Sequence, residues 1–418
     1  MPGLLLAAAV AACSANTQRA AGPTAGAPVT VAAVPRTSVA PPSTPATEAA
    51  TTTTGVPATT TTTVSTTTTT TTTTVPASAP AAPSAASACL ARQPLRERAA
   101  LLTWPGVYAN QWDAAVGVVR DRHVGGVVLM TAGSDVAGDL AALRNASPHG
   151  LLVSTDEEGG AVQRLRASGR LSSAADVAAT RTPDEARALV AAHGRVIRDL
   201  GIDVVLGPVV DVNPPGGTSP LGDRLFSDDP SRVAAYGRAY LLGWRDAGIV
   251  GVLKHFPGHG SASADTHNGP GRTPPLASLR ARDLVPYAEL AALRPAVMVG
   301  HLSVPGLTDG DGLPASLSRS AVTGLLRGEL GYADALVFTD ALEMGAVRNV
   351  AAVPEAAVLA LAAGADVVLF SGTSLTGSVI DAIVAAVGAG RLSDAAITAS
   401  ANRVVRSYAD PVSVCRAA

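Results

Sequence analysis

The sequence is short of charge, and the charges it has are not gathered together. Charged residues make up 15% of the 418 residues, the formal net charge is −2, and there is no block of Lys or Arg. A chain without a basic block lacks the electrostatic footprint of nucleic-acid binding and of a charged membrane-surface patch. Both kinds of partner are therefore disfavoured. Part of the low charge reflects a long, nearly uncharged N-terminal region.

Residues 14–87 lack aromatic side chains and are poor in bulky apolar ones. They are mainly Thr, Ala, Pro and Ser, with threonine runs at 59–63 and 66–74. Such a segment buries too little apolar surface to offset the entropy of ordering it, so residues 13–88 are predicted to be a disordered tether. The composition is typical of O-glycosylated stalks and equally of an unmodified linker. Residues 89–418 remain, which is enough for one large domain.

No apolar run near the N-terminus is long enough to span a bilayer. The run from Leu4 to Ala12 is short, and Val10-Ala11-Ala12-Cys13 resembles a bacterial lipobox, in which the cysteine is diacylated. The usual positive start is missing, because residues 2 and 3 are Pro and Gly. We expect a signal peptide at 1–12 and an exported lipoprotein that faces the cell wall and meets the membrane only through its lipid anchor. A cleaved secretory signal without lipid is the alternative.

Cysteine is rare, with Cys13, Cys89 and Cys415 only. If Cys13 is lipidated, the other two remain and bracket the folded region. Exported proteins occupy oxidising surroundings, where paired cysteines tend to be joined. The sequence therefore predicts a disulfide between Cys89 and Cys415.

Within the folded region, short apolar runs alternate with Ala-rich helical stretches. The runs are continuous rather than alternating, as expected for parallel strands buried on both faces. Candidate strands are Ala99–Trp104, Gly126–Met130, Leu151–Asp156, Val204–Asp211, Val250–His255, Val297–His301, Leu336–Asp340 and Asp366–Phe370. Candidate helices include Pro183–Leu200, Pro230–Ala247, Ser318–Leu330 and Glu355–Ala363. Eight such repeats predict an α/β fold, a single (β/α)₈ TIM barrel, although a doubly wound open sheet alternates in the same way.

Polar residues at the strand ends favour the barrel. Asp156, Asp211, His255, His301 and Asp340 each stand at or just after the C-terminal end of a candidate strand. In a barrel these ends converge on one face around one pocket, whereas an open sheet would spread them along an edge. Each carboxylate alone is equally consistent with a helix N-cap.

The segment Lys254-His255-Phe256-Pro257-Gly258-His259-Gly260, followed by Asp265-Thr266-His267, concentrates titratable groups at a strand exit. An aspartate two residues before a histidine can orient the imidazole for proton transfer, and a merely structural histidine is the alternative. Three imidazoles and a carboxylate could also bind a metal. The adjacent cation of Lys254 and the lack of a zinc motif argue against that, and no metal is expected.

Together these motifs resemble glycoside hydrolase family 3, in its NagZ-type β-N-acetylglucosaminidase branch. The resemblance covers residues 95–405 and keeps the motif order Asp156-Glu157-Glu158-Gly159-Gly160, Gly222-Asp223-Arg224-Leu225-Phe226, the Lys254–His267 segment and Thr339-Asp340-Ala341-Leu342-Glu343-Met344. It implies that Asp340 is the catalytic nucleophile and that His267 is the general acid/base, with Asp265 as its partner. It also implies that sugar hydroxyls are held by Asp156, Arg224, Lys254 and His255.

The resemblance further implies a retaining hydrolase that removes terminal GlcNAc from peptidoglycan fragments such as GlcNAc–MurNAc. No metal or organic cofactor is expected, and the chain is expected to be a monomer. Two alternatives remain open. A phosphorylase on the same fold would use phosphate in place of water, and a non-catalytic wall-binding lipoprotein would bind sugar without turnover.

Overall fold

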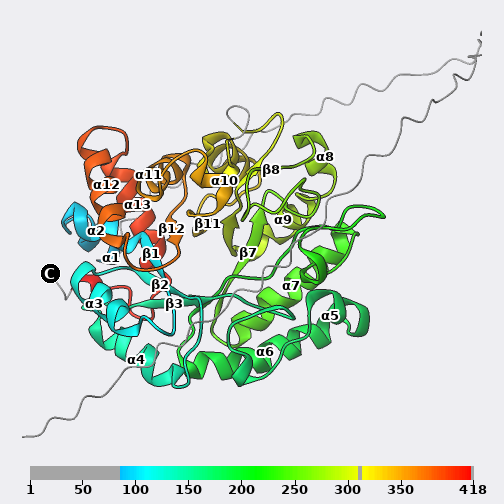
Figure 1. Ribbon diagram of the computed structural model, residues 1–418, viewed down its shortest axis with the longest axis horizontal. Helices are drawn as coiled ribbons and strands as arrows, with labels where there is room; N and C mark the ends of the chain where they lie inside the picture. The colour runs from blue at the N-terminus through cyan, green and yellow to red at the C-terminus, as the bar shows by residue number, and fades with distance from the viewer. Residues whose placement is uncertain (1–84, 309–312, 416–418) are drawn as a thin grey trace, which may run out of the picture. The chain divides into compact units, whose positions relative to one another are not determined.

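Eight parallel strands close into a barrel in the computed structural model, which describes residues 85–308 and 313–415 (Figure 1). Every neighbouring pair is parallel, and the order around the barrel is β1-β12-β11-β9-β7-β6-β3-β2. The strands are β1 (Thr103–Val107), β2 (Gly126–Leu129), β3 (Leu152–Thr155), β6 (Val204–Val205), β7 (Val250–Phe256), β9 (Ala296–Val299), β11 (Val337–Ala341) and β12 (Val367–Phe370). The predicted barrel is confirmed, and the open sheet is excluded.

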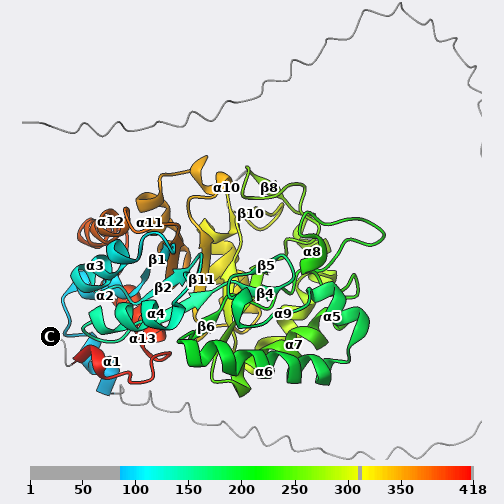
Figure 2. The same ribbon diagram turned by 60° about the horizontal axis from the view of Figure 1, so that its bottom comes forward.

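Helices surround the barrel, as Figures 1 and 2 show from two directions. They are α2 (Leu95–Leu101), α3 (Trp112–Arg122), α4 (Val136–Ala146), α5 (Ala174–Thr180), α6 (Pro183–Leu200), α7 (Pro230–Asp246), α8 (Leu276–Ala281), α9 (Val285–Leu290), α11 (Val353–Ala363), α12 (Thr376–Gly388) and α13 (Asp394–Val405). A π-type helix, η5 (Ser320–Glu329), takes the place predicted for an α-helix at 318–330.

Helix α6 shows why its bounds were predictable. Thr182 and Glu185 form a reciprocal capping box, and Pro183 occupies the first turn. Gly201 ends the helix in the left-handed region, with φ of 110°. These residues satisfy the unpaired backbone groups at both ends of a helix, so the predicted range Pro183–Leu200 is confirmed.

The first predicted strand, Ala99–Trp104, was wrong in its position. Residues 95–101 form α2, and β1 starts only at Thr103. The run Ala99–Leu102 is buried, as a barrel strand would also be. A short apolar run in the sequence does not distinguish a strand from a buried helix. Pro94 precedes α2, which is a favourable position for a residue without an N–H.

The fourth predicted strand, Val204–Asp211, is paired at its start only. Strand β6 covers Val204–Val205, and the next contact with β7 is an isolated bridge between Val209 and Lys254. Pro208 lies between them and has no N–H to donate to a ladder. The chain nevertheless continues beside β7, because Val210 N donates to Lys254 O at 2.8 Å.

The two ends of the described domain meet. Helix α1 (Ala85–Leu90) contacts η6 (Ser413–Cys415), and Gln93 Nε2 donates to Val414 O at 2.8 Å. Cys89 is disulfide-bonded, but the side chain of Cys415 lies outside the described residues, so their pairing stays a prediction. Helix α1 occupies positions 85–88, which the sequence placed in the tether. Cys13, the signal peptide and the rest of the tether also lie outside the described residues.

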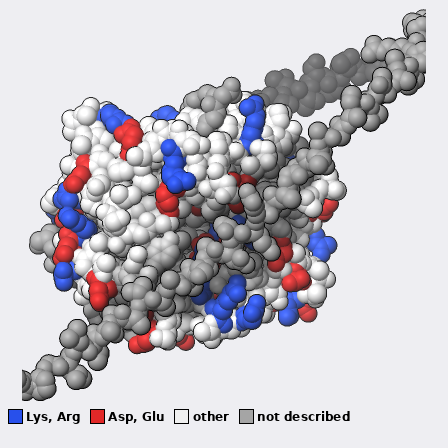
Figure 3. Space-filling view, viewed as in Figure 1, with Lys and Arg blue, Asp and Glu red and all other residues white. Residues whose placement is uncertain are grey.

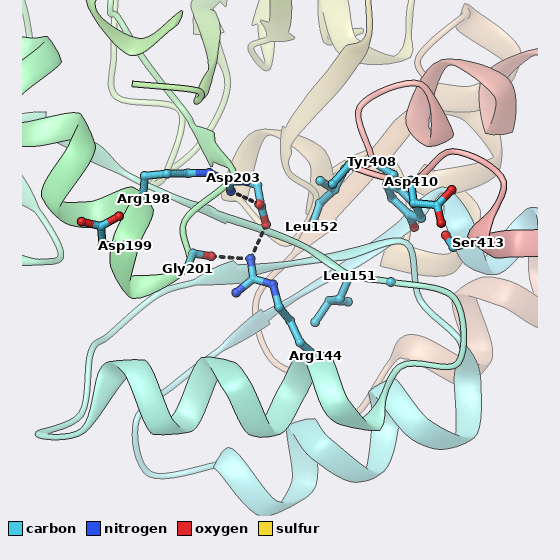
Figure 4. Close-up of a pocket in the computed structure, with 12 residues that line it drawn as sticks. Arg144, Leu151, Leu152, Arg198, Asp199, Gly201, Asp203, Tyr408, Asp410 and Ser413 are labelled. Carbon is cyan, nitrogen blue, oxygen red and sulfur yellow. Dashed lines mark hydrogen bonds and ion pairs between the residues drawn. The ribbon is translucent and has the colours of Figure 1, made fainter. Parts of the chain in front are cut away.

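A hollow of ≈ 520 Å³ lies at the N-terminal end of the strands, where β3 and β6 begin (Figure 4). Arg144 and Arg198 approach Asp203 from different sides, and each makes an ion pair with it. Asp203 also accepts a hydrogen bond from Val153 N at 2.9 Å. This foot cluster, Arg144–Asp203–Arg198, ties the start of β3 to the last turns of helices α4 and α6.

Acidic and basic side chains are interspersed on the face seen in Figure 3. Within 85–308 and 313–415, no helix combines the length and apolarity needed to cross a membrane.

Candidate active site

The C-terminal ends of the strands meet at a cavity of ≈ 100 Å³ that brings three predicted residues together. Asp156 follows β3, Asp340 lies near the end of β11, and His267 comes from the loop after β7. The cavity is lined by Val128, Met130, Asp156, Arg164, Leu206, His267, Met298, Asp340, Ala341, Leu369, Phe370 and Ser371. An apolar enclosure with a few convergent polar groups is the usual form of a small-ligand site.

Lys254 lies beneath this cavity as the centre of a charged network. Its Nζ is 2.8 Å from Asp156 Oδ1 and 2.6 Å from Glu158 Oε1, and its side chain is 3% exposed. Burial alone would lower the pKa of Lys254, but the two carboxylates outweigh it and raise the pKa above its ordinary value. Burial would likewise raise the pKa of Asp156, yet Lys254 and Arg164 hold it well below its usual range. The network is therefore fully ionised at neutral pH.

Arg224 is held away from the cavity. It comes from η2 (Gly222–Arg224) and makes a bidentate pair with Glu158, with Nε and Nη2 at 2.7 and 2.9 Å from the two carboxylate oxygens. Its Nη2 is also 3.4 Å from His255 Nε2. Two parallel bonds of this kind fix a guanidinium in one orientation. Arg224 thus orients the network from the side and is not among the cavity-lining residues.

His255 and the turn after it are organised by Asp211, which is fully buried. Asp211 Oδ2 is 2.7 Å from His255 Nδ1, and Asp211 Oδ1 accepts a hydrogen bond from His259 N at 2.6 Å. An ionised carboxylate only accepts, so Nδ1–H of His255 donates. Nε2 is then the acceptor, on the side of Arg224. His255 and Lys254 are adjacent in β7 and occupy one connected polar layer.

Asp340 keeps its charge at the cavity. Its Oδ1 accepts a hydrogen bond from Ala341 N at 2.8 Å. Burial alone would raise the pKa of Asp340, but its surroundings, which include the hydrogen bond from Ala341 N and the cation of Lys254, outweigh burial and lower the pKa. A carboxylate kept ionised in a water-poor pocket can attack an electron-poor carbon.

His301 stabilises the same strand end. Its Nε2 is 2.9 Å from Ala341 O and its Nδ1 is 2.8 Å from Ser316 Oγ. The carbonyl only accepts, so Nε2–H donates to it and Nδ1 accepts from the serine hydroxyl. Burial lowers the pKa of His301, which suits this neutral form.

Asp265 and His267 form the predicted pair. His267 Nδ1 is 2.7 Å from Asp265 Oδ1, and His267 N donates to the same oxygen at 2.9 Å. The two side chains are 65% and 45% exposed, in contrast with the buried network. Burial would raise the pKa of Asp265, but its hydrogen bonds from His267 outweigh this and lower it. The carboxylate therefore accepts from Nδ1–H and leaves Nε2 for proton exchange.

Several residues of the site were not predicted from the sequence. Glu158 bridges Lys254 and Arg224, and Arg164 Nη2 lies 3.2 Å from Asp156 Oδ2. Glu343 accepts from Ser371 N at 2.8 Å and from the Ser371 hydroxyl. Glu158 and Glu343 belong to two motifs of the family resemblance, so the sequence could have indicated them as site residues. Nothing in the sequence singled out Arg164.

The histidines do not converge as a metal site would. His255 Nδ1 is engaged by Asp211, and His267 Nδ1 by Asp265. In the part of the chain that the structure describes, no group of three or more His, Cys, Asp or Glu is placed to hold a metal ion.

Comparison with known proteins gives one consistent relationship. The profile of the glycosyl hydrolase family 3 N-terminal domain matches residues 94–407. The β-hexosaminidase LpqI of Mycobacterium tuberculosis is 45% identical over 304 residues, covering 69% of this chain and 77% of the relative. A β-hexosaminidase of Xylella fastidiosa is 38% identical over 291 residues, covering 66% of this chain and 84% of the relative.

Solved structures agree. A glycosyl hydrolase of this family from Mycobacterium smegmatis matches with a TM-score of 0.72 and 43% identity, over 76% of this chain and 98% of the other. A family 3 β-N-acetylglucosaminidase from a Paenibacillus species matches with a TM-score of 0.71 and 33% identity, over 75% of this chain and 62% of the other. The resemblance identified from the sequence is confirmed, and the chain belongs to glycoside hydrolase family 3.

Proposed function

We propose that this protein is a retaining β-N-acetylglucosaminidase that removes terminal GlcNAc from peptidoglycan fragments such as GlcNAc–MurNAc. The β-N-acetylhexosaminidase type of activity follows from relatives that are 36–45% identical. One observation carries the mechanism: Asp156, His267 and Asp340 line a single cavity at the barrel mouth. The sugar, nucleophile and proton donor can meet there.

In the first step, Asp340 attacks the anomeric carbon of the bound sugar. Its Oδ1 is held by Ala341 N, so Oδ2 is the attacking oxygen. As the glycosidic bond breaks, His267 Nε2 gives a proton to the departing oxygen, and a covalent glycosyl-enzyme forms on Asp340. The Asp265 carboxylate stabilises the imidazolium before this transfer.

In the second step, neutral His267 removes a proton from water, and the water oxygen attacks the same carbon. The bond to Asp340 breaks, the carboxylate is regenerated, and the product keeps the original anomeric configuration. The exposed position of His267 suits this exchange of a leaving sugar for water.

The charged network holds the sugar. Asp156 reaches the cavity as an acceptor fixed by Lys254, and Arg164 adds a cation at the same wall. Lys254, Arg224 and His255 are not among the residues that line the cavity. They bind the sugar ring directly only where a sugar hydroxyl displaces one of their present hydrogen-bond partners. Charge-assisted bonds of this kind fix a ring for attack.

The wall location is part of the proposal. Lipidation at Cys13 would anchor the chain, and the tether at 13–88 would let the barrel reach nearby fragments. The enzyme would then act in cell-wall turnover and recycling, without a cofactor.

The test is incubation with defined muropeptides, with and without phosphate, followed by identification of the products. The proposal expects free GlcNAc in both conditions. GlcNAc 1-phosphate as the main product would replace hydrolysis with phosphorolysis, and binding without turnover would indicate a non-catalytic wall protein.

A further inference from the structure

The loop that carries Asp265 and His267 exposes these two side chains, but backbone hydrogen bonds attach the loop to the rest of the barrel. It joins β7 to the short strand β8 (Gly271–Arg272). Gly345 N donates to His267 O at 3.1 Å, and Ala346 N donates to Thr266 O at 3.3 Å. Both donors begin helix α10 (Gly345–Arg348), which follows β11 and Asp340. The nucleophile segment and the acid/base loop are therefore joined by main-chain hydrogen bonds.

The two segments approach each other closely at Gly345. A Cβ built on it would lie 2.8 Å from Asn268 C and 2.9 Å from both Asn268 O and Gly269 N. All three are backbone atoms, so no side-chain rotation relieves the contact. Gly345 is not among the glycines with positive φ, so its backbone conformation is open to any residue. Space for the acid/base loop, rather than conformation, is what requires glycine here.

Thr266 is a second anchor, through its side chain. It is buried, and its Oγ1 lies 3.2 Å from His259 Nε2. His259 is in turn fixed by its N–H bond of 2.6 Å to Asp211, the carboxylate that also orients His255. The residue beside His267 is thus tied to the buried layer under the sugar site. This gives His259, which carries no role in the proposed chemistry, a structural function.

We infer that Gly345 and Thr266 are positioning residues that set His267 against Asp340 for proton transfer. The inference rests on the proposed function, because it assumes that His267 is the acid/base. Neither residue lines the cavity at the barrel mouth. Gly345 fixes the loop to the start of α10, and Thr266 fixes it to His259 and so to Asp211.

The first test is Gly345→Ala, assayed as kcat/KM on N-acetylglucosaminides with good and poor leaving groups. The added methyl displaces the loop, and a misplacement of about 1 Å can cost up to ~100-fold in a positioned step. We expect a loss of about 10- to 100-fold on GlcNAc disaccharides and under about threefold on the dinitrophenyl glycoside, which needs little protonation. On the dinitrophenyl substrate the second step still needs the base, so kcat should fall, and azide, which attacks without a base, should restore kcat.

The matched control is Gly117→Ala, in α3, where the nearest atom to a new Cβ is a flexible Arg120 nitrogen at 4.0 Å. It should behave as the parent on every substrate. An equal loss of Gly345→Ala on both leaving groups, or no loss on either, would overturn the inference.

The second test applies even if Gly345→Ala folds poorly. Thr266→Val removes the hydroxyl that meets His259 but keeps the shape, whereas Thr266→Ser keeps the hydroxyl. We expect a loss of about 3- to 10-fold for valine on poor leaving groups, the value of one hydrogen bond, and recovery with serine. Equal activity of the valine and serine variants would contradict the anchor.

His267→Ala distinguishes a failure of the positioning role from a failure of the acid/base role. If it shows the leaving-group dependence and azide rescue while Gly345→Ala and Thr266→Val match the parent, only the positioning inference fails. If His267→Ala itself shows neither signature, the proposed acid/base role fails first.

Discussion

Asp156 at the mouth of the barrel and Asp203 at its foot each lie between two cations. At the foot, Asp203 pairs with Arg144 and Arg198, whose side chains are 31% and 38% exposed. At the mouth, Asp156 pairs with Lys254, which is 3% exposed, and with Arg164. The pairing is alike, but the surroundings differ.

Besides Asp203, the arginines of the foot cluster bond backbone carbonyls. Arg144 also donates to Gly201 O and Arg198 to Ile202 O, so the guanidiniums hold backbone in place. At the mouth, the network continues to Glu158 and Arg224, and Asp156 links it to the cavity that also holds Asp340, the proposed nucleophile, and His267. The hollow at the foot is ≈ 520 Å³ and the cavity at the mouth ≈ 100 Å³, so cavity size does not identify the site. Titratable groups facing one enclosed space identify it.

The largest expected effect comes from Asp340. Asp340→Ala removes the proposed nucleophile and should lower kcat by about 10⁴-fold or more on an aryl N-acetylglucosaminide, with the fold intact by circular dichroism. The same change at the foot, Asp203→Ala, should leave kcat nearly unaltered. Retained activity in Asp340→Ala would place the chemistry elsewhere.

Lys254→Met should be the most destabilising of the charge changes. It leaves Asp156 and Glu158 buried without their shared cation, which costs about 3–5 kcal/mol in the free energy of unfolding, measured by denaturant titration. Arg144→Met at the foot should cost at most about 1 kcal/mol, because that guanidinium is partly exposed. Similar losses at both ends would remove the contrast.

The same pair of variants predicts a pH dependence. The lowered pKa of Asp156 contributes stability that is present above the ordinary aspartate pKa and is lost as pH falls through the folded-state value. Removing the Lys254 cation raises that pKa toward the unfolded value, so Lys254→Met has less of this stability to lose, and its deficit relative to the parent should shrink as pH falls below about 4. Parallel acid-unfolding curves would argue against the role given to Lys254.

Asp203→Asn should lower stability without touching the chemistry. It weakens two ion pairs and one backbone bond, for a loss of about 1–3 kcal/mol. We expect kcat/KM within about twofold of the parent, since the foot is not part of the mechanism. A large drop in kcat/KM with unchanged stability would indicate that the two ends are coupled.

The smallest effect concerns Asp283, a carboxylate near the mouth whose Oδ1 is buried without a hydrogen-bond partner among the residues that the structure describes. Burial, reinforced by Asp211, raises the pKa of Asp283 to about 7. A raised carboxyl pKa means that stability falls as pH rises from the ordinary value of about 4 to about 7. Asp283→Asn should flatten this slope and add about 1 kcal/mol at pH 8. A steeper slope would contradict the assignment.

The barrel and the convergence of polar strand-end residues on one cavity were predictable for a physical reason. Parallel strands place their C-terminal ends on one face, so Asp156 and Asp340 could be assigned to one site from their place in two separate runs. The Asp265–His267 contact is local, two residues apart, and follows from spacing. Helix α6 follows from its caps.

The ion-pair partners that lie far apart in the sequence were not predictable. Nothing in the sequence says that Arg224 turns to Glu158, or that Lys254 divides its bonds between Asp156 and Glu158, because these contacts join distant segments. The helix at 95–101 and the early end of β6 were missed because short apolar runs fit either structure until packing decides.

The central claim is a covalent glycosyl-enzyme on Asp340. The most direct measurement uses His267→Ala, in which the second step lacks its base, with a dinitrophenyl N-acetylglucosaminide, followed by proteolysis and mass spectrometry. The proposed mechanism predicts that the peptide containing Asp340 carries one N-acetylglucosaminyl group. A sugar on another residue, or no adduct together with an inverted product, would contradict it.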